Sequence, residues 1–158
     1  MPRSLTFSVF RHNPRDPADA PRTQEYRLDE TPGMTLFIAL TRIREELDPS
    51  LNFDFVCRAG VCGSCAMVIN GRPGLACRTL TASLPAEIGL FPLPGFELIG
   101  DLSVNTGKWM RAMSERLRAW VHLQDEPDVD ALEAPMEPEL AEAVYELDRC
   151  VECGCCVA

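Results

Sequence analysis

The chain has 158 residues, of which 46% are hydrophobic and 25% charged, as expected for a globular protein with one ordinary domain or two small ones. Its net charge of −9 arises in residues 124–148, which hold ten acidic side chains and no Lys or Arg. We interpret this run as a solvated linker and helix face, and the lack of a basic stripe argues against nucleic-acid binding. The sequence has no apolar run of about 18 residues and no secretory signal, so neither a transmembrane helix nor a disulfide framework is expected.

The N-terminal residues predict two strands followed by a helix. Residues 4–10 alternate apolar and polar side chains at period two, and residues 23–28 look like the strand that returns beside them. Thr35 is the expected N-cap of a helix whose apolar side chains recur at helical spacing as far as Leu47. The pair Asp48-Pro49 then ends the helix.

The most informative motif follows this helix. Four cysteines stand in the pattern C-x4-C-x2-C-x11-C, namely Cys57, Cys62, Cys65 and Cys77. This spacing is the plant-type ligand set of a [2Fe–2S] cluster, which predicts an electron carrier. Gly60 and Gly63 give the loop the backbone freedom to fold back around two irons and let N–H groups approach the sulfurs. A structural zinc module is the alternative, although zinc sites prefer paired C-x2-C units.

A hairpin is predicted to bring the fourth cysteine back to the first three. Residues 66–69 are predicted as a strand, Asn70-Gly71 is a strong signal for a two-residue turn, and residues 73–78 form the returning arm. Residues 88–93 look like one more short strand. Together these elements predict a small mixed sheet with one helix laid across it.

The C-terminal part is predicted to be helical. Beyond about residue 104, Met110 and Met113 begin an apolar helix face that continues to Trp120. Residues 124–138 contain three prolines and look like a linker, and residues 139–148 are predicted as a short helix. We place a domain boundary near residue 104.

A second group of cysteines closes the sequence. Cys150, Cys153 and Cys156 give C-x2-C-x2-C, the first three positions of the bacterial ferredoxin motif for a [4Fe–4S] cluster. The fourth cysteine of that motif would fall beyond Ala158, so such a cluster needs a more distant ligand that this sequence does not contain. Cys155 is out of register, and we expect a thiol near the site rather than a ligand.

The remaining chemically active side chains give weaker signals. His12 and His122 are isolated, so a Rieske centre, which needs two His ligands, is not expected. No acid–base pair or activated nucleophile is evident, and no catalytic residue is assigned. Arg58 and Arg78 each follow a cysteine, and either they stabilise the charge of a reduced cluster or they are ordinary surface arginines.

Four stretches of the sequence carry a family resemblance: residues 51–65, 70–79, 102–107 and 148–156. They closely resemble the iron–sulfur subunit of the succinate dehydrogenase/fumarate reductase family, in a form most similar to the menaquinol:fumarate reductases of anaerobic bacteria. The resemblance implies an α+β fold, with a β-grasp (plant-type) ferredoxin domain over residues 1–104. It also implies that residues 105–158 begin a helical, bacterial-ferredoxin-like domain, truncated here, so the chain is expected to be part of a longer subunit.

The same resemblance implies cofactors and partners. Cys57, Cys62, Cys65 and Cys77 would bind the [2Fe–2S] cluster, and Cys150, Cys153 and Cys156 would supply part of the [4Fe–4S] ligand set; a [3Fe–4S] cluster is implied by the family alone. The subunit would dock between an FAD-containing flavoprotein and a membrane cytochrome b anchor with menaquinone, on the cytoplasmic face of the bacterial inner membrane. Electrons would pass from quinol to the flavin, where fumarate is reduced to succinate. Succinate oxidation in the opposite direction remains an alternative.

Overall fold

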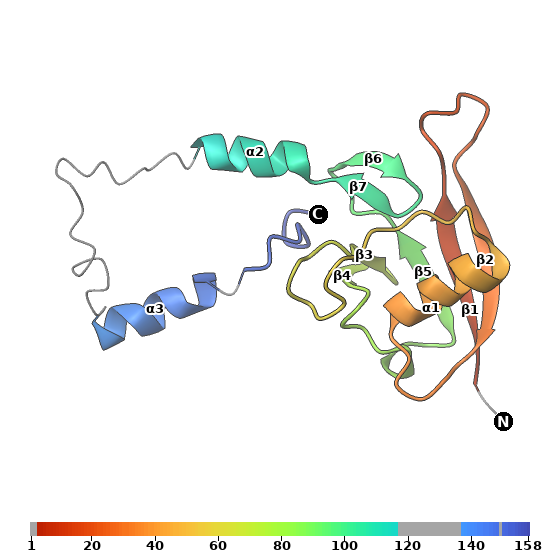
Figure 1. The fold of residues 1–158 in the computed structure, drawn as a ribbon, viewed down its shortest axis with the longest axis horizontal. Coiled ribbons are helices and arrows are strands. Elements are labelled where there is room, and N and C mark those ends of the chain that lie inside the picture. Colours follow the sequence, from red (N-terminus) through yellow and green to blue (C-terminus); the bar gives the residue numbers. More distant parts are fainter. Residues whose placement is uncertain (1–2, 117–136, 149) are drawn as a thin grey trace. The chain divides into compact units, whose positions relative to one another are not determined.

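The computed structural model describes residues 3–116, 137–148 and 150–158 (Figure 1). The chain divides into two compact units, one comprising Met1–Gly107 and Val151–Ala158 and the other Lys108–Cys150. The last eight residues therefore belong with the N-terminal unit. The division into domains of residues 1–104 and 105–158 stays a prediction.

A five-stranded mixed sheet forms the framework of the first unit, in the order β2-β1-β5-β3-β4. Strands β1 and β5 run parallel, and the other neighbouring pairs are antiparallel. The strands are β1 Ser4–Arg11, β2 Arg22–Asp29, β3 Ala66–Ile69, β4 Arg72–Leu75 and β5 Glu87–Phe91. The mixed sheet, the opening hairpin and the later strands are thus confirmed, each within a few residues of its predicted bounds.

The period-two pattern of β1 decides which face of the sheet is buried. Leu5, Phe7 and Val9 are fully buried, whereas the residues between them are partly exposed. These side chains join one hydrophobic core with Ile88 and Leu90 of β5. This buried, apolar face fixes β1 on the core, and β1 lies between β2 and β5 in the sheet.

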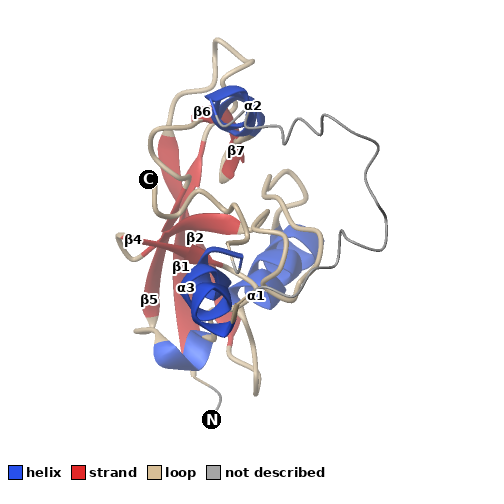
Figure 2. Cartoon of the chain, turned by 90° about the vertical axis from the view of Figure 1, so that its left-hand side faces the viewer, coloured by secondary structure: helices blue, strands red, loops and turns tan. Residues whose placement is uncertain are grey.

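One helical segment packs on the core of the sheet, as predicted (Figure 2). Helix α1 spans Leu36–Arg42, and the side chain of its N-cap Thr35 accepts a hydrogen bond from the N–H of Ile38. The segment continues as a π-helical turn over Ile43–Leu47 and ends at Asp48, whose backbone is extended. The start and the end of the helix are therefore confirmed, while the widened last turn was not foreseen.

The remaining elements are short. Thr81–Ser83 forms a 3₁₀ turn, and β6 (Glu97–Gly100) pairs with β7 (Ser103–Asn105) in a separate two-stranded sheet. Helix α2 spans Gly107–Arg116, and α3 spans Pro138–Asp148, one residue longer than predicted. His122, Trp120 and residues 124–136 of the predicted linker lie outside the described residues. In the part of the chain that the structure describes, no helix is long and apolar enough to cross a membrane.

Candidate iron–sulfur site

The hairpin β3–β4 brings Cys77 back to Cys65. Both turn residues, Asn70 and Gly71, have positive φ values of 47° and 79°, as a type I′ turn requires. Ala76 then donates its N–H to the carbonyl of Cys65 at 3.1 Å, and the N–H of Cys77 donates to the Sγ of Cys65 at 3.4 Å. The predicted return of the fourth cysteine is confirmed.

Backbone N–H groups surround the sulfurs of the cysteine loop. The Sγ of Cys57 accepts hydrogen bonds from the N–H groups of Ala59, Val61 and Cys62, each at 3.3 Å. The Sγ of Cys62 accepts from the N–H of Cys57 at 3.4 Å and from the hydroxyl of Ser64 at 3.2 Å. Since such donors stabilise negative charge on sulfur, the loop is organised for thiolates and for the sulfurs of a cluster.

The four thiols form an outer pair and an inner pair. Cys57 is partly exposed and Cys62 exposed, whereas only 4% of Cys65 and 8% of Cys77 are accessible. The N–H groups of Ala59 and Val61 lower the pKa of the Cys57 thiol to about 6. Burial raises the pKa of the Cys65 thiol to about 11. One side of the site therefore faces solvent and the other faces the core.

This arrangement fits a two-iron centre. In such a centre each iron takes two cysteine thiolates, so the ligands are needed as two pairs. A single zinc ion instead needs three or four ligands converging on one point. Four thiols in an outer and an inner pair, with N–H groups directed at their sulfurs, fit the ligand chemistry of an iron–sulfur cluster.

The second cysteine group is divided between the two units. Cys150 belongs to the unit Lys108–Cys150, whereas Cys153 and Cys156 lie in the C-terminal segment of the first unit. That segment ends in a turn in which Val157 donates its N–H to the carbonyl of Gly154 at 3.0 Å. Burial raises the pKa of the Cys155 thiol to about 12, with smaller contributions from neighbouring cysteines that include Cys65.

The two arginines next to the first group differ in surroundings. Arg58 is exposed, in the left-handed region at φ 57°. The Arg78 side chain lies over Gly60, where a Cβ would come within 2.7 Å of its Cγ. The role of either arginine toward a reduced cluster stays a prediction.

Aromatic packing holds the segment that leads into the cysteine loop. Phe53 is buried, and its ring centroid lies 5.6 Å from that of Phe55. The Arg44 guanidinium carbon lies 4.7 Å from the Phe53 centroid and 5.2 Å from the Phe55 centroid, within the range of cation–π contacts. The ring of Phe37, from α1, lies 4.9 Å from Phe55. The chain just before Cys57 is therefore fixed to the helix.

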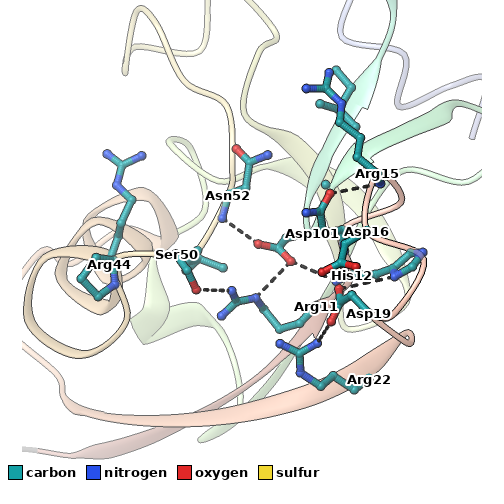
Figure 3. Close-up of a pocket in the computed structure, with 15 residues that line it drawn as sticks. Arg11, His12, Arg15, Asp16, Asp19, Arg22, Arg44, Ser50, Asn52 and Asp101 are labelled. Carbon is teal, nitrogen blue, oxygen red and sulfur yellow. Dashed lines mark hydrogen bonds and ion pairs between the residues drawn. The ribbon is translucent and has the colours of Figure 1, made fainter.

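A buried arginine anchors the same segment at its other end, beside an open pocket of about 700 Å³ (Figure 3). Arg11 is only 4% exposed; it forms ion pairs with Asp48 and Asp101 and donates to the Ser50 hydroxyl at 2.7 Å. Asp101 in turn accepts the N–H of Asn52 at 2.8 Å. This cluster joins β1, the end of the helix and the turn after β6.

Sequence reasoning missed Arg11, although a signal was present. Arg11 continues the odd-numbered register of Leu5, Phe7 and Val9, which places it on the buried face of β1. A charge on that face needs buried partners. His12, by contrast, belongs to no cluster of histidines in the described residues, and its Nδ1 lies 3.6 Å from Asp19.

The cluster predicts a pH dependence of stability. Burial by itself would raise the pKa of Asp48, but hydrogen bonds from Ser50, Tyr26 and Arg11 outweigh it and hold that pKa well below its usual value. The folded state therefore favours charged Asp48, and this stabilisation is full above the unfolded-state pKa of about 4 and is lost as pH falls below it. In acid titrations of the free energy of unfolding, wild type should lose stability more steeply than Asp48→Asn between about pH 5 and about pH 2.

If the free energy of unfolding fell equally steeply with pH in wild type and Asp48→Asn, the stabilising role of charged Asp48 would be contradicted.

Comparisons with known proteins agree with this geometry. Residues 6–111 match the family described as 2Fe-2S iron-sulfur cluster binding domain. The chain is 57% identical over its whole length to the fumarate reductase iron-sulfur subunit of Wolinella succinogenes, covering 66% of that protein. It is 34% identical to the mitochondrial succinate dehydrogenase (ubiquinone) iron-sulfur subunit 1 of Oryza sativa subsp. japonica, over 96% of this chain and 54% of that protein.

A solved structure shows the same fold. A chain of the Mycobacterium smegmatis Sdh1 complex in the apo form superposes with a TM-score of 0.85 at 23% identity, over 99% of this chain and 63% of that chain. The chain thus spans about two thirds or less of the length of these relatives. It belongs to the 2Fe-2S iron-sulfur cluster binding domain family, together with the iron–sulfur subunits of fumarate reductase and succinate dehydrogenase.

Proposed function

We propose that this chain is the electron-transfer part of a quinol:fumarate reductase, an oxidoreductase complex in which fumarate is reduced to succinate. Cys57, Cys62, Cys65 and Cys77 would hold the [2Fe–2S] cluster. The observation that carries this proposal is the collection of these thiols, by the β3–β4 hairpin and the N–H donors of the loop, into an outer and an inner pair. The 57% identity over the whole chain to a fumarate reductase subunit supports the choice of complex.

The cofactor would supply the redox chemistry, accepting and releasing one electron at a time. The protein's own contribution is to bind, orient and shield it. The N–H groups directed at Cys57 would stabilise the added negative charge on reduction. Burial of Cys65 and Cys77 would exclude water from the inner side.

The second cysteine group would extend the relay. Cys150, Cys153 and Cys156 would supply three ligands of a [4Fe–4S] cluster. A [3Fe–4S] cluster would complete the path toward a membrane cytochrome b anchor with menaquinone, and the protein would lie as a peripheral subunit on the cytoplasmic face of the inner membrane. These statements rest on the similarity to the iron–sulfur subunits and on the cysteine spacing.

The outer side of the first site has the character of a docking surface. Val56 is 71% exposed and Val61 is 69% exposed, and each is next to an accessible cysteine of the outer pair. Exposed apolar side chains beside an electron-exchange site are suited to a partner that must approach closely and exclude water. We assign this face to the FAD-containing flavoprotein subunit.

Two alternatives are weaker. Succinate dehydrogenase activity would use the same relay in reverse; the identity to the rice succinate dehydrogenase subunit is 34%, against 57% for the Wolinella fumarate reductase subunit. A structural zinc module would favour paired C-x2-C units, whereas the first cysteine group has the spacing C-x4-C-x2-C-x11-C.

A charged side chain on the outer side of the first site tests the docking surface. Val61→Glu should weaken binding of the flavoprotein subunit by about tenfold or more, because a buried apolar contact would be replaced by a desolvated charge. The measurement is the dissociation constant between the purified cluster-containing protein and the flavoprotein.

Ile38→Glu provides the matched control, since Ile38 is also exposed but lies on α1. Equal affinities for wild type and Val61→Glu would exclude this face as the flavoprotein contact. An iron–sulfur spectrum unchanged in both variants would show that the cluster itself is intact.

A further inference from the structure

The backbone of the first cysteine loop lies directly against the second cysteine motif at Gly63. Gly63 is buried, and a Cβ built on it would fall 2.7 Å from the carbonyl oxygen of Val151 and 2.8 Å from both Cα and Cβ of Cys153. Two of these three atoms belong to the backbone, so no side-chain rotation can make room for a methyl group. The close approach of the two loops at this point therefore depends on Gly63 having no side chain.

A second buried glycine, in the second cysteine motif, makes another close contact. Gly154 is buried at φ 78°, and a Cβ there would fall 2.8 Å from Cζ of Phe96. Phe96 lies just before β6, in the first unit. The segment around Cys153 therefore makes two close contacts, one with Gly63 of the first loop and one, through Gly154, with the Phe96 ring.

Gly60 shows that this contact is not a general property of the loop. It has a similar positive φ, 77° against 71° for Gly63, so a side chain would strain both backbones alike. A Cβ on Gly60, however, would meet only side-chain atoms of Arg78, which is exposed and flexible. The two glycines share their backbone conformation, but Gly60 contacts a side chain whereas Gly63 contacts backbone atoms of the second motif.

We propose that Gly63 is a positioning residue that sets how closely the segment around Cys153 approaches the first cysteine loop, and hence the electronic coupling between the two clusters. The inference rests on the proposed function, since it presupposes that both motifs carry clusters. Adding a methyl group at position 63 would push Cys153 outward without replacing any proposed ligand. The analogous change at position 60 would displace only the Arg78 side chain.

The test compares Gly63→Ala with Gly60→Ala in the purified complex that contains all its clusters. Iron and acid-labile sulfide are measured first, together with the electron paramagnetic resonance signal of each reduced cluster. The second readout is the relaxation enhancement, defined as the increase in the spin relaxation rate of the first cluster when the second cluster is also reduced. Because magnetic dipolar coupling falls with the cube of distance, this enhancement reports the spacing between the clusters independently of turnover.

In variants whose two cluster signals are both present, we expect Gly60→Ala to keep the wild-type relaxation enhancement and Gly63→Ala to show a smaller one. Wild-type enhancement in Gly63→Ala, with both cluster signals present, would overturn the inference and leave the proposed function standing. Absence of iron–sulfur signals from the wild-type protein would instead overturn the proposed function.

A second pair of variants decides the matter if Gly63→Ala fails to assemble its first cluster. Gly154→Ala lies outside the first loop and should weaken the enhancement because its methyl group meets the Phe96 ring. Phe96→Ala combined with Gly154→Ala should restore part of it, since the strain from φ is the same and only the obstructing ring is removed. No difference between the single and the double variant would count against the contact.

Discussion

Replacement of Cys77 by serine is expected to remove the cluster of the first cysteine group. Iron–sulfur clusters are held by thiolates, and a serine oxygen is a harder and poorer ligand for them. Cys77 is buried, and its N–H donates to the Sγ of Cys65, so the change falls on the inner side of the site. The visible absorption and the reduced-state resonance signal assigned to this group should fall below about a tenth of wild type, since even changes to the groups around metal ligands cost about 10- to 100-fold in metal affinity.

Cys155→Ser is the matched control for this loss. Cys155 is a half-buried cysteine of the same chain, but it is out of register with the ligand pattern. Its substitution should leave iron and sulfide content unchanged. An undiminished first-group spectrum in Cys77→Ser would contradict the assignment of Cys77, and cluster loss in Cys155→Ser would add Cys155 to the ligands.

The second large effect is on stability. Arg11→Met should lower the free energy of unfolding by about 3–5 kcal/mol, because it leaves two carboxylates without their buried cation. The side chains of Asp48 and Asp101 are only 17% and 8% exposed, so water cannot replace the guanidinium well. Chemical denaturation followed by the fluorescence or circular dichroism of the first unit would measure the change.

Arg22→Met is the control for that experiment. Arg22 also pairs with an aspartate, Asp19, but its side chain is 49% exposed, and such surface pairs contribute about 1 kcal/mol or less. A loss in Arg11→Met no larger than the loss in Arg22→Met would contradict the structural role of the Arg11 cluster. Adding Asp101→Asn to Arg11→Met should recover part of the stability, since it removes one of the unpaired charges.

Local patterns were sufficient to predict the parts of the fold that carry the cysteines. The Asn70-Gly71 turn, the Thr35 cap and the alternation in β1 each depend on residues close together in sequence, and the structure confirms all three. The return of Cys77 could be foreseen because a hairpin of known turn length fixes its own register.

Features that depend on distant residues could not be predicted in the same way. The ion pair between Arg11 and Asp101 joins residues 90 positions apart in the sequence. The strands β6 and β7 are three or four residues long and include glycine and polar residues, so their periodicity is too short to detect. The contact between Gly63 and Cys153 likewise arises only from packing, because the spacing within either motif does not specify how the two motifs meet.

The most direct test of the account is metal and sulfide analysis of the purified wild-type protein, combined with its resonance spectrum after reduction. The proposed ligand set predicts iron and acid-labile sulfide in equal amounts at the first cysteine group, with an unpaired-electron signal that appears on one-electron reduction. A colourless protein that contains zinc, no labile sulfide and no such signal would contradict the electron-transfer function.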